Sequence, residues 1–205
     1  MVGAVITVLF VWIWFRTSGD KTRDRELVIW SFFISMTSIF VARALAFSLP
    51  FRERPLRVPE LQFRLPYAAD RLALIGWSSF PSDHAAIFFT ASTALLFISR
   101  QLGILSLLYT FFAICIPRVY LGVHYPTDII AGALIGISLG ALTALPRLRA
   151  AVASPLLRWE HDYPGSFYPF FFLVAFEFSE LFDSLRAAGH VGYVFIRQAL
   201  NHTLH

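Results

Sequence analysis

Charged residues and cysteine are both scarce in this sequence, and each scarcity excludes a class of protein. Only 15% of the 205 residues are charged, 57% are hydrophobic, and the mean hydropathy is +0.65. Soluble domains carry about a quarter charged residues. The composition therefore excludes an ordinary soluble globule and predicts a single integral membrane domain over residues 1–205. Cys115 is the only cysteine, so an intrachain disulfide is excluded.

The sequence shows no visible internal repeat, and its first apolar run lacks the features typical of a cleavable leader. The apolar run from Val2 to Phe15 has no basic segment before it and no small-residue cleavage site after it. We therefore predict a short membrane helix there and no signal peptide. The net charge of +4 comes mostly from arginines at the ends of apolar blocks. This placement favours anionic membrane lipids as partners and argues against nucleic acid.

Long apolar blocks predict an all-α fold, a polytopic membrane helix bundle with about six transmembrane helices. A span needs roughly 20 apolar residues. Residues 27–145 are predicted to form the catalytic core, and residues 183–205 to form a tail that is either interfacial or mobile. The six blocks are Val2–Phe15, Leu27–Leu49, His84–Ser99, Leu102–Ile116, Ile129–Leu145 and Phe167–Phe182.

The connections between the blocks predict a topology. Segments 16–26, 100–101 and 147–163 are expected on one side of the membrane, and segments 50–81 and 118–128 on the other with the tail. The positive-inside rule favours the first set as cytoplasmic. The second set would then face the periplasm or exterior of a bacterial inner membrane. That set is basic too, and a functional site would explain its arginines, which are Arg52, Arg54, Arg57, Arg64 and Arg71.

Three motifs on that second side carry groups suited to phosphoryl chemistry. They are Arg54-Pro55, the segment Pro81-Ser82-Asp83-His84, and the stretch from Arg118 to Asp128. Arginine binds phosphate oxygens bidentately and stays charged. Arg54 and Arg118 are thus expected to neutralise a transferring phosphoryl group. Ser82 is at a predicted helix start, where its hydroxyl and free backbone N–H groups favour an anion.

Two histidines and one aspartate supply the reactive groups. Asp128 follows His124 by one helical turn, so its carboxylate can hold the imidazole in one tautomer. His124 would attack phosphorus through its other nitrogen, while His84 would protonate the leaving oxygen and later activate water. A single histidine at a helix end is more often structural. The ordered combination of three motifs at span ends is what indicates a site.

Together these motifs resemble the type 2 phosphatidic acid phosphatase family, which is related to the vanadium haloperoxidases. The family pattern is Lys-x6-Arg-Pro, Pro-Ser-Gly-His and Ser-Arg-x5-His-x3-Asp. The resemblance implies that His124 is the nucleophile forming a phosphohistidine, that Asp128 orients it, and that His84 is the acid. It also implies that no metal or cofactor takes part, and that the phosphate is bound by Arg54, Ser82 and Arg118.

Three positions depart from the family pattern. The lysine of the first motif falls at Phe47, and Arg43 or Arg52 is expected to replace its phosphate contact. The glycine of the second motif is Asp83, whose carboxylate either repels the phosphate or points away and hydrogen-bonds locally. The serine of the third motif is Pro117, which removes a hydroxyl. Pro-Ser-Asp-His is a form associated with bacterial undecaprenyl pyrophosphate phosphatases of this family.

The expected function is therefore that of a membrane lipid phosphatase acting on a lipid phosphate or pyrophosphate. A polyprenyl pyrophosphate is favoured, and phosphatidic acid, phosphatidylglycerophosphate and lipid A phosphate stay open. One alternative is a lipid phosphotransferase that uses the same phosphohistidine. The other is a non-enzymatic homologue with a decayed site.

Overall fold

The structure is a computed structural model that describes residues 3–17, 19–62 and 76–181. Its described residues form α-helices with short 3-10 and π segments and contain no strand, so the predicted all-α fold is confirmed. The tail predicted at 183–205 lies outside the described residues. The α-helices are α1 (Ala4–Phe15), α2 (Lys21–Ser48), α3 (Asp83–Leu96), α4 (Arg100–Tyr109), α5 (Ile116–Tyr120), α6 (Pro126–Ala141), α7 (Pro146–Asp162) and α8 (Pro164–Ser179).

Three described helices are long and apolar enough to cross a membrane, which makes the chain an integral membrane protein. They are Lys21–Ser48, Arg100–Tyr120 and Pro126–Ala144. The second is a composite in which a π-helical turn, Thr110–Cys115, joins α4 to α5. Pro117 follows that turn and lacks the N–H that would continue the α-helical pattern.

The predicted number of six spans is not confirmed. α1 has 12 residues, α3 has 14 and α8 has 16. At 1.5 Å per residue even the longest of these covers only about 24 Å, less than the roughly 30 Å of a hydrocarbon core. α3 is apolar because neighbouring helices cover it, and most of its residues are buried. Hydropathy alone does not distinguish such a covered helix from a spanning one.

The segment 147–163, which we predicted as a connection between spans, is instead occupied almost entirely by the amphipathic helix α7. Its apolar face packs against the core through Val152, Leu156 and Trp159. Ion pairs hold its polar face to the start of α2. Arg149 Nε lies 3.0 Å from a Glu26 carboxylate oxygen, and Arg25 Nη1 lies 2.9 Å from a Glu160 oxygen.

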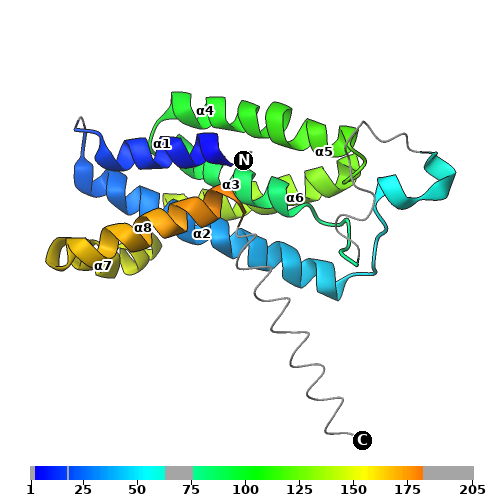
Figure 1. Cartoon of the computed structure of the whole chain (residues 1–205). Helices are drawn as coiled ribbons and strands as arrows, with labels where there is room; N and C mark the ends of the chain where they lie inside the picture. Colours follow the sequence, from blue (N-terminus) through cyan, green and yellow to red (C-terminus); the bar gives the residue numbers. More distant parts are fainter. Residues whose placement is uncertain (1–2, 18, 63–75, 182–205) are drawn as a thin grey trace, which may run out of the picture.

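α3 lies at the centre of the bundle and packs closely on α6, as Figure 1 shows. The contact depends on glycines spaced four residues apart in α6. A Cβ at Gly132 would lie 2.4 Å from the Ser82 carbonyl oxygen, and one at Gly136 would lie 2.5 Å from that of Ala86. Small residues at this spacing let helix backbones approach closely. The first turns of α3 and α6 are therefore held together at one end of the bundle.

Candidate active site

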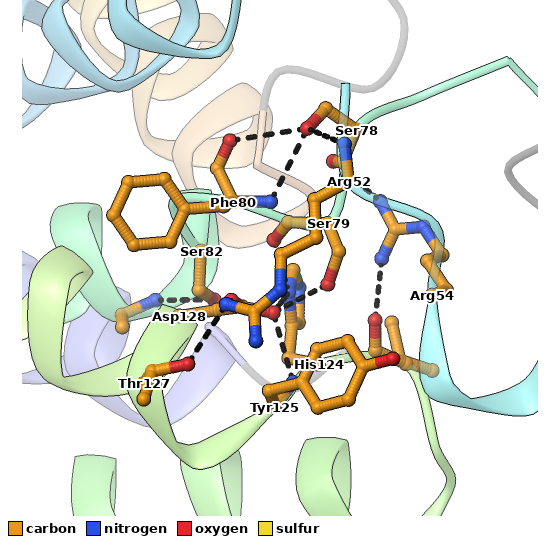
Figure 2. Close-up of polar contacts among 12 residues, drawn as sticks. Arg52, Arg54, Ser78, Ser79, Phe80, Ser82, His124, Tyr125, Thr127 and Asp128 are labelled. Carbon is orange, nitrogen blue, oxygen red and sulfur yellow. Dashed lines mark hydrogen bonds and ion pairs between the residues drawn. The ribbon is translucent and has the colours of Figure 1, made fainter. Parts of the chain in front are cut away.

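The three motif segments meet at that end, as Figure 2 shows. The Ser82 N–H donates to the Asp128 carbonyl at 3.1 Å, and the Ser79 N–H donates to the Arg52 carbonyl at 2.8 Å. Arg54 Nη1 donates to the Val123 carbonyl at 2.8 Å. Backbone and side-chain hydrogen bonds thus join the segment that follows α2, the start of α3 and the α5–α6 turn.

His124 is buried and oriented by a backbone carbonyl. Its side chain is 3% exposed, and Nδ1 lies 2.8 Å from the Ser79 carbonyl oxygen. A carbonyl only accepts hydrogen bonds, so the proton is assigned to Nδ1. Nε2 makes no hydrogen bond to any residue that the structure describes. Nε2 therefore keeps its lone pair and is the nitrogen available as a nucleophile.

Asp128 is fully buried and accepts hydrogen bonds from several donors. Arg52 Nη1 lies 2.7 Å from one carboxylate oxygen. The other accepts from the Tyr125 N–H at 2.8 Å and from the Ser79 hydroxyl. His124 Nδ1 is 3.6 Å from this second oxygen, longer than a hydrogen bond. Asp128 is thus next to the imidazole as predicted, but the closest contact of Nδ1 is with Ser79.

Our sequence reasoning missed Ser79 as a site residue. Its carbonyl faces His124 while its hydroxyl holds Asp128, so it contacts both partners. Every residue has a carbonyl, so the sequence gives no signal for the first contact. Proximity to the Pro81-Ser82 motif is the only hint of the second. Arg52 also lies 4.1 Å from the centre of the Tyr125 ring and donates to Thr127.

Arg54 is a buried cation. It is 2% exposed, and in the described part of the chain it forms no ion pair. Its Nε is buried and has no hydrogen-bond partner. Burial is the main cause that lowers the pKa of Arg54 to about 10, and the charges of Arg57 and Arg118 add to it. A charged group buried this way fits an anion as its missing partner.

Burial also lowers the pKa of His124 below its usual value of 6.5. The charge of Arg54 acts in the same direction, whereas the Asp128 carboxylate and the Ser79 carbonyl oppose it. The imidazole is consequently neutral at neutral pH, which is the nucleophilic form. Arg118 contributes in two ways. Its charge reaches Arg54, and its carbonyl accepts the N–H groups of Val123 and His124 at 3.0 and 3.3 Å.

The second motif forms the start of α3. Ser82 is fully buried and caps the helix, its hydroxyl accepting from the Ala85 N–H at 3.4 Å. His84 lies in the first helical turn, half-buried, with its ring centre 6.5 Å from that of Phe88. The phosphate-binding role of Ser82 and the acid role of His84 stay predictions.

Asp83 and Arg43, both predicted to lie at the phosphate, form an ion pair with each other. The Arg43 guanidinium lies 4.2 Å from the centre of the Trp77 ring. Asp83 therefore makes a local contact, one of the two alternatives that the sequence left open. Among residues 3–17, 19–62 and 76–181, no three His, Cys, Asp or Glu side chains gather closely enough to hold a metal ion.

Three relatives of this chain have names that describe phosphatases. YbjG of Escherichia coli (strain K12), named provisionally as an undecaprenyl-diphosphatase, is 33% identical over 140 residues, which are 68% of this chain and 63% of that protein. The undecaprenyl-diphosphatase BcrC of Bacillus subtilis (strain 168) is 27% identical over 146 residues, 69% of this chain and 66% of that protein. The lipid A 4'-phosphatase of Bacteroides thetaiotaomicron is 46% identical over 63 residues, 30% of this chain and 28% of that protein.

The match thus spans less than two thirds of the length of each of these relatives. No solved structure gives a significant match to this chain. The sequence model of one family, described as the PAP2 superfamily, matches residues 28–149 and so covers all three motifs. The resemblance to the type 2 phosphatidic acid phosphatases is confirmed at this level, and the chain belongs to the PAP2 superfamily.

Proposed function

We propose that this protein is a membrane lipid phosphatase that hydrolyses a lipid phosphate or pyrophosphate through a phosphohistidine. The observation that carries the proposal is the pairing of His124 with Arg54. The imidazole has Nδ1 held by the Ser79 carbonyl and Nε2 without a partner among the described residues. The guanidinium of Arg54 is buried too and forms no ion pair with the residues that the structure describes. A nucleophile and an unmatched cation suit an incoming phosphoryl group.

The reaction has two steps. His124 Nε2 attacks phosphorus, a P–N bond forms, and the bond from phosphorus to the leaving oxygen breaks. His84 gives its proton to that oxygen. Water then attacks phosphorus while His84 takes the water proton, and the P–N bond breaks to release phosphate. Arg54 and Arg118 offset the charge on the phosphoryl oxygens in both steps.

A lipid substrate is supported by the apolar surface around the site. The residues just before the first motif are exposed, with Phe47 84% and Phe51 57% accessible. Tyr120, at the end of α5 and four residues before His124, is 71% accessible. Exposed aromatic side chains at the ends of apolar helices are typical of the membrane interface. A phosphate carried by a lipid would be presented at that level.

A polyprenyl pyrophosphate is the favoured substrate class within this proposal. Two relatives are named as undecaprenyl-diphosphatases, and they match over the larger part of this chain. The relative named as a lipid A phosphatase matches over a shorter part, so lipid A phosphate is the second candidate. We further propose that the site faces the periplasm or exterior of a bacterial inner membrane, because the opposing connections carry the basic residues expected in the cytoplasm.

The test is phosphate release by the purified protein in detergent, with EDTA present. The substrate panel contains a polyprenyl pyrophosphate, lipid A, phosphatidic acid and phosphatidylglycerophosphate. His124→Ala is the active-site variant, and His161→Ala, at an exposed position of α7, is the matched control. We expect EDTA-resistant release by the wild type and by His161→Ala, and none by His124→Ala.

Quench trapping at acid and at alkaline pH, with a substrate labelled in the transferred phosphate, tests the mechanism. A phosphohistidine is acid-labile and alkali-stable, so a label retained only under alkaline quench identifies it. Full turnover by His124→Ala would overturn the mechanism. Transfer of the label to an added lipid acceptor in place of water would identify a phosphotransferase.

A further inference from the structure

We infer that Arg43 is a positioning residue that neutralises Asp83 and keeps that carboxylate away from the bound phosphate. The inference rests on the proposed function and refines it, because it assigns Arg43 a role other than binding phosphate. It concerns a position where the chain differs from the family pattern, which has glycine in place of Asp83. The structure shows how the protein accommodates this extra carboxylate.

The Asp83 carboxylate lies at the helix end where the phosphate is proposed to bind. Asp83 is the first residue of α3, between Ser82 and His84, and only 6% of it is exposed. The N-terminus of a helix carries a partial positive charge that attracts any anion. An unpaired aspartate there would compete with a phosphate for the same field and would also repel it. Both effects would weaken phosphate binding beside His84.

Arg43 counters the Asp83 charge from another helix. It lies near the end of α2, and its Nη2 forms an ion pair with an Asp83 carboxylate oxygen. Both side chains are largely buried, so the attraction is little screened by solvent. The pair has no net charge, and the carboxylate is directed toward α2.

Trp77 fixes the position of the guanidinium. Its ring centre is 4.2 Å from Arg43, a distance typical of a cation–π contact. Trp77 belongs to the segment that leads to Ser79, whose carbonyl orients His124. Arg43 therefore contacts both the start of α3 and the segment from Trp77 to Ser79, whose carbonyl orients His124. Its geometry differs from that of Arg54, which forms no ion pair in the described chain.

The inference predicts that removing the Asp83 carboxylate restores the KM of an Arg43 variant. Arg43→Gln would remove the guanidinium that pairs with Asp83, so we expect KM to rise by about tenfold or more while kcat changes less. Asp83→Gly in the same chain removes the carboxylate, so Arg43→Gln/Asp83→Gly is expected to return KM to within about threefold of wild type. A phosphate ligand at Arg43 would give the opposite result, with the double variant as impaired as Arg43→Gln.

The experiment measures kcat and KM for the wild type, both single variants and the double variant, with thermal unfolding of each. Arg43→Gln/Asp83→Asn is a second double variant that keeps a hydrogen-bonding pair without charge, and it is used if Arg43→Gln does not fold. A double variant that stays as weak as Arg43→Gln, or an Arg43→Gln protein with unchanged KM, overturns the inference. An inactive wild type would count against the proposed function instead.

Discussion

The two main packing surfaces of this bundle are built in opposite ways. Between α3 and α6, glycines bring two backbones into direct contact, and an added Cβ at Gly132 would meet a carbonyl oxygen at 2.4 Å. Between α1, α2 and α8, aromatic rings fill the space. The ring centre of Phe178 lies 6.1 Å from that of Phe10, 5.2 Å from that of Phe32 and 6.0 Å from that of Phe88.

This difference between the two packing surfaces indicates where the protein needs accurate geometry. The glycine contact ends at Ser82, whose N–H bonds to the Asp128 carbonyl, so it sets the spacing between the two halves of the site. The aromatic layer has no hydrogen bond to the site residues among those described and supplies buried apolar area. Aromatic packing stabilises a fold and tolerates small shifts. The glycine contact does not tolerate such shifts, because backbone atoms cannot relieve a clash by adopting another rotamer.

The largest expected effect comes from breaking the glycine contact. Gly132→Val would force α6 away from the Ser82 carbonyl by about an ångström, and misplacement of this size costs about 100-fold in rate. We expect kcat/KM to fall at least that far, measured as phosphate release. Gly165→Val is the matched control, because nothing lies within 4 Å of a Cβ there. Equal activity in both variants would mean that the contact does not set the site.

Breaking the aromatic layer is expected to lower stability and leave the site intact. Phe178→Leu removes ring contacts with three neighbours, and we expect the free energy of unfolding to fall by about 2 kcal/mol. The turnover of each folded molecule should stay near the wild-type value. Thermal unfolding and active-site titration with phosphate release measure the two quantities. A large loss of kcat at full folding would show that this layer also positions the site.

The pH dependence of kcat/KM also tests the comparison between the glycine contact and the aromatic layer. Because burial lowers the pKa of His124, we expect kcat/KM to stay level as pH falls from 7 through 6.5, then to drop about tenfold per unit as the imidazole is protonated. On the alkaline side, activity should fall as His84 loses the proton that it donates, and again near pH 10 as Arg54 loses its charge. Phe178→Leu should keep this profile. An acid limb centred at 6.5 or above would contradict the buried, neutral imidazole.

The smallest expected effect lies at the polar face of α7, outside both surfaces. Glu26→Gln removes the carboxylate that pairs with Arg149, a partly exposed contact. Such pairs contribute about 0.2–1 kcal/mol, so unfolding should change by no more than that and activity should not change. Calorimetry at low and high salt measures the first quantity. A loss above about 2 kcal/mol would indicate that this pair fixes α7 to α2.

Motif order and spacing predicted the family and the three segments that meet in the site, and the long apolar blocks predicted the helical fold. They did not predict Ser79, because one of its two contacts is made by a backbone carbonyl. They also did not pair Arg43 with Asp83, since 40 residues separate them and either charge alone looked like a phosphate contact. The six predicted spans are not confirmed, because α3 is largely covered by protein and an apolar helix has the same composition whether protein or lipid surrounds it.

Arg54 also links the folded state to the solutes around it. Its buried guanidinium forms no ion pair with the described residues, and this raises the free energy of the protein, so any oxyanion that binds there relieves this cost. A ligand at 100 times its Kd adds about 2.7 kcal/mol to the free energy of unfolding. Phosphate, the product, would therefore stabilise the protein against heat as well as inhibit it. The group that makes the empty bundle less stable is the group that retains the product.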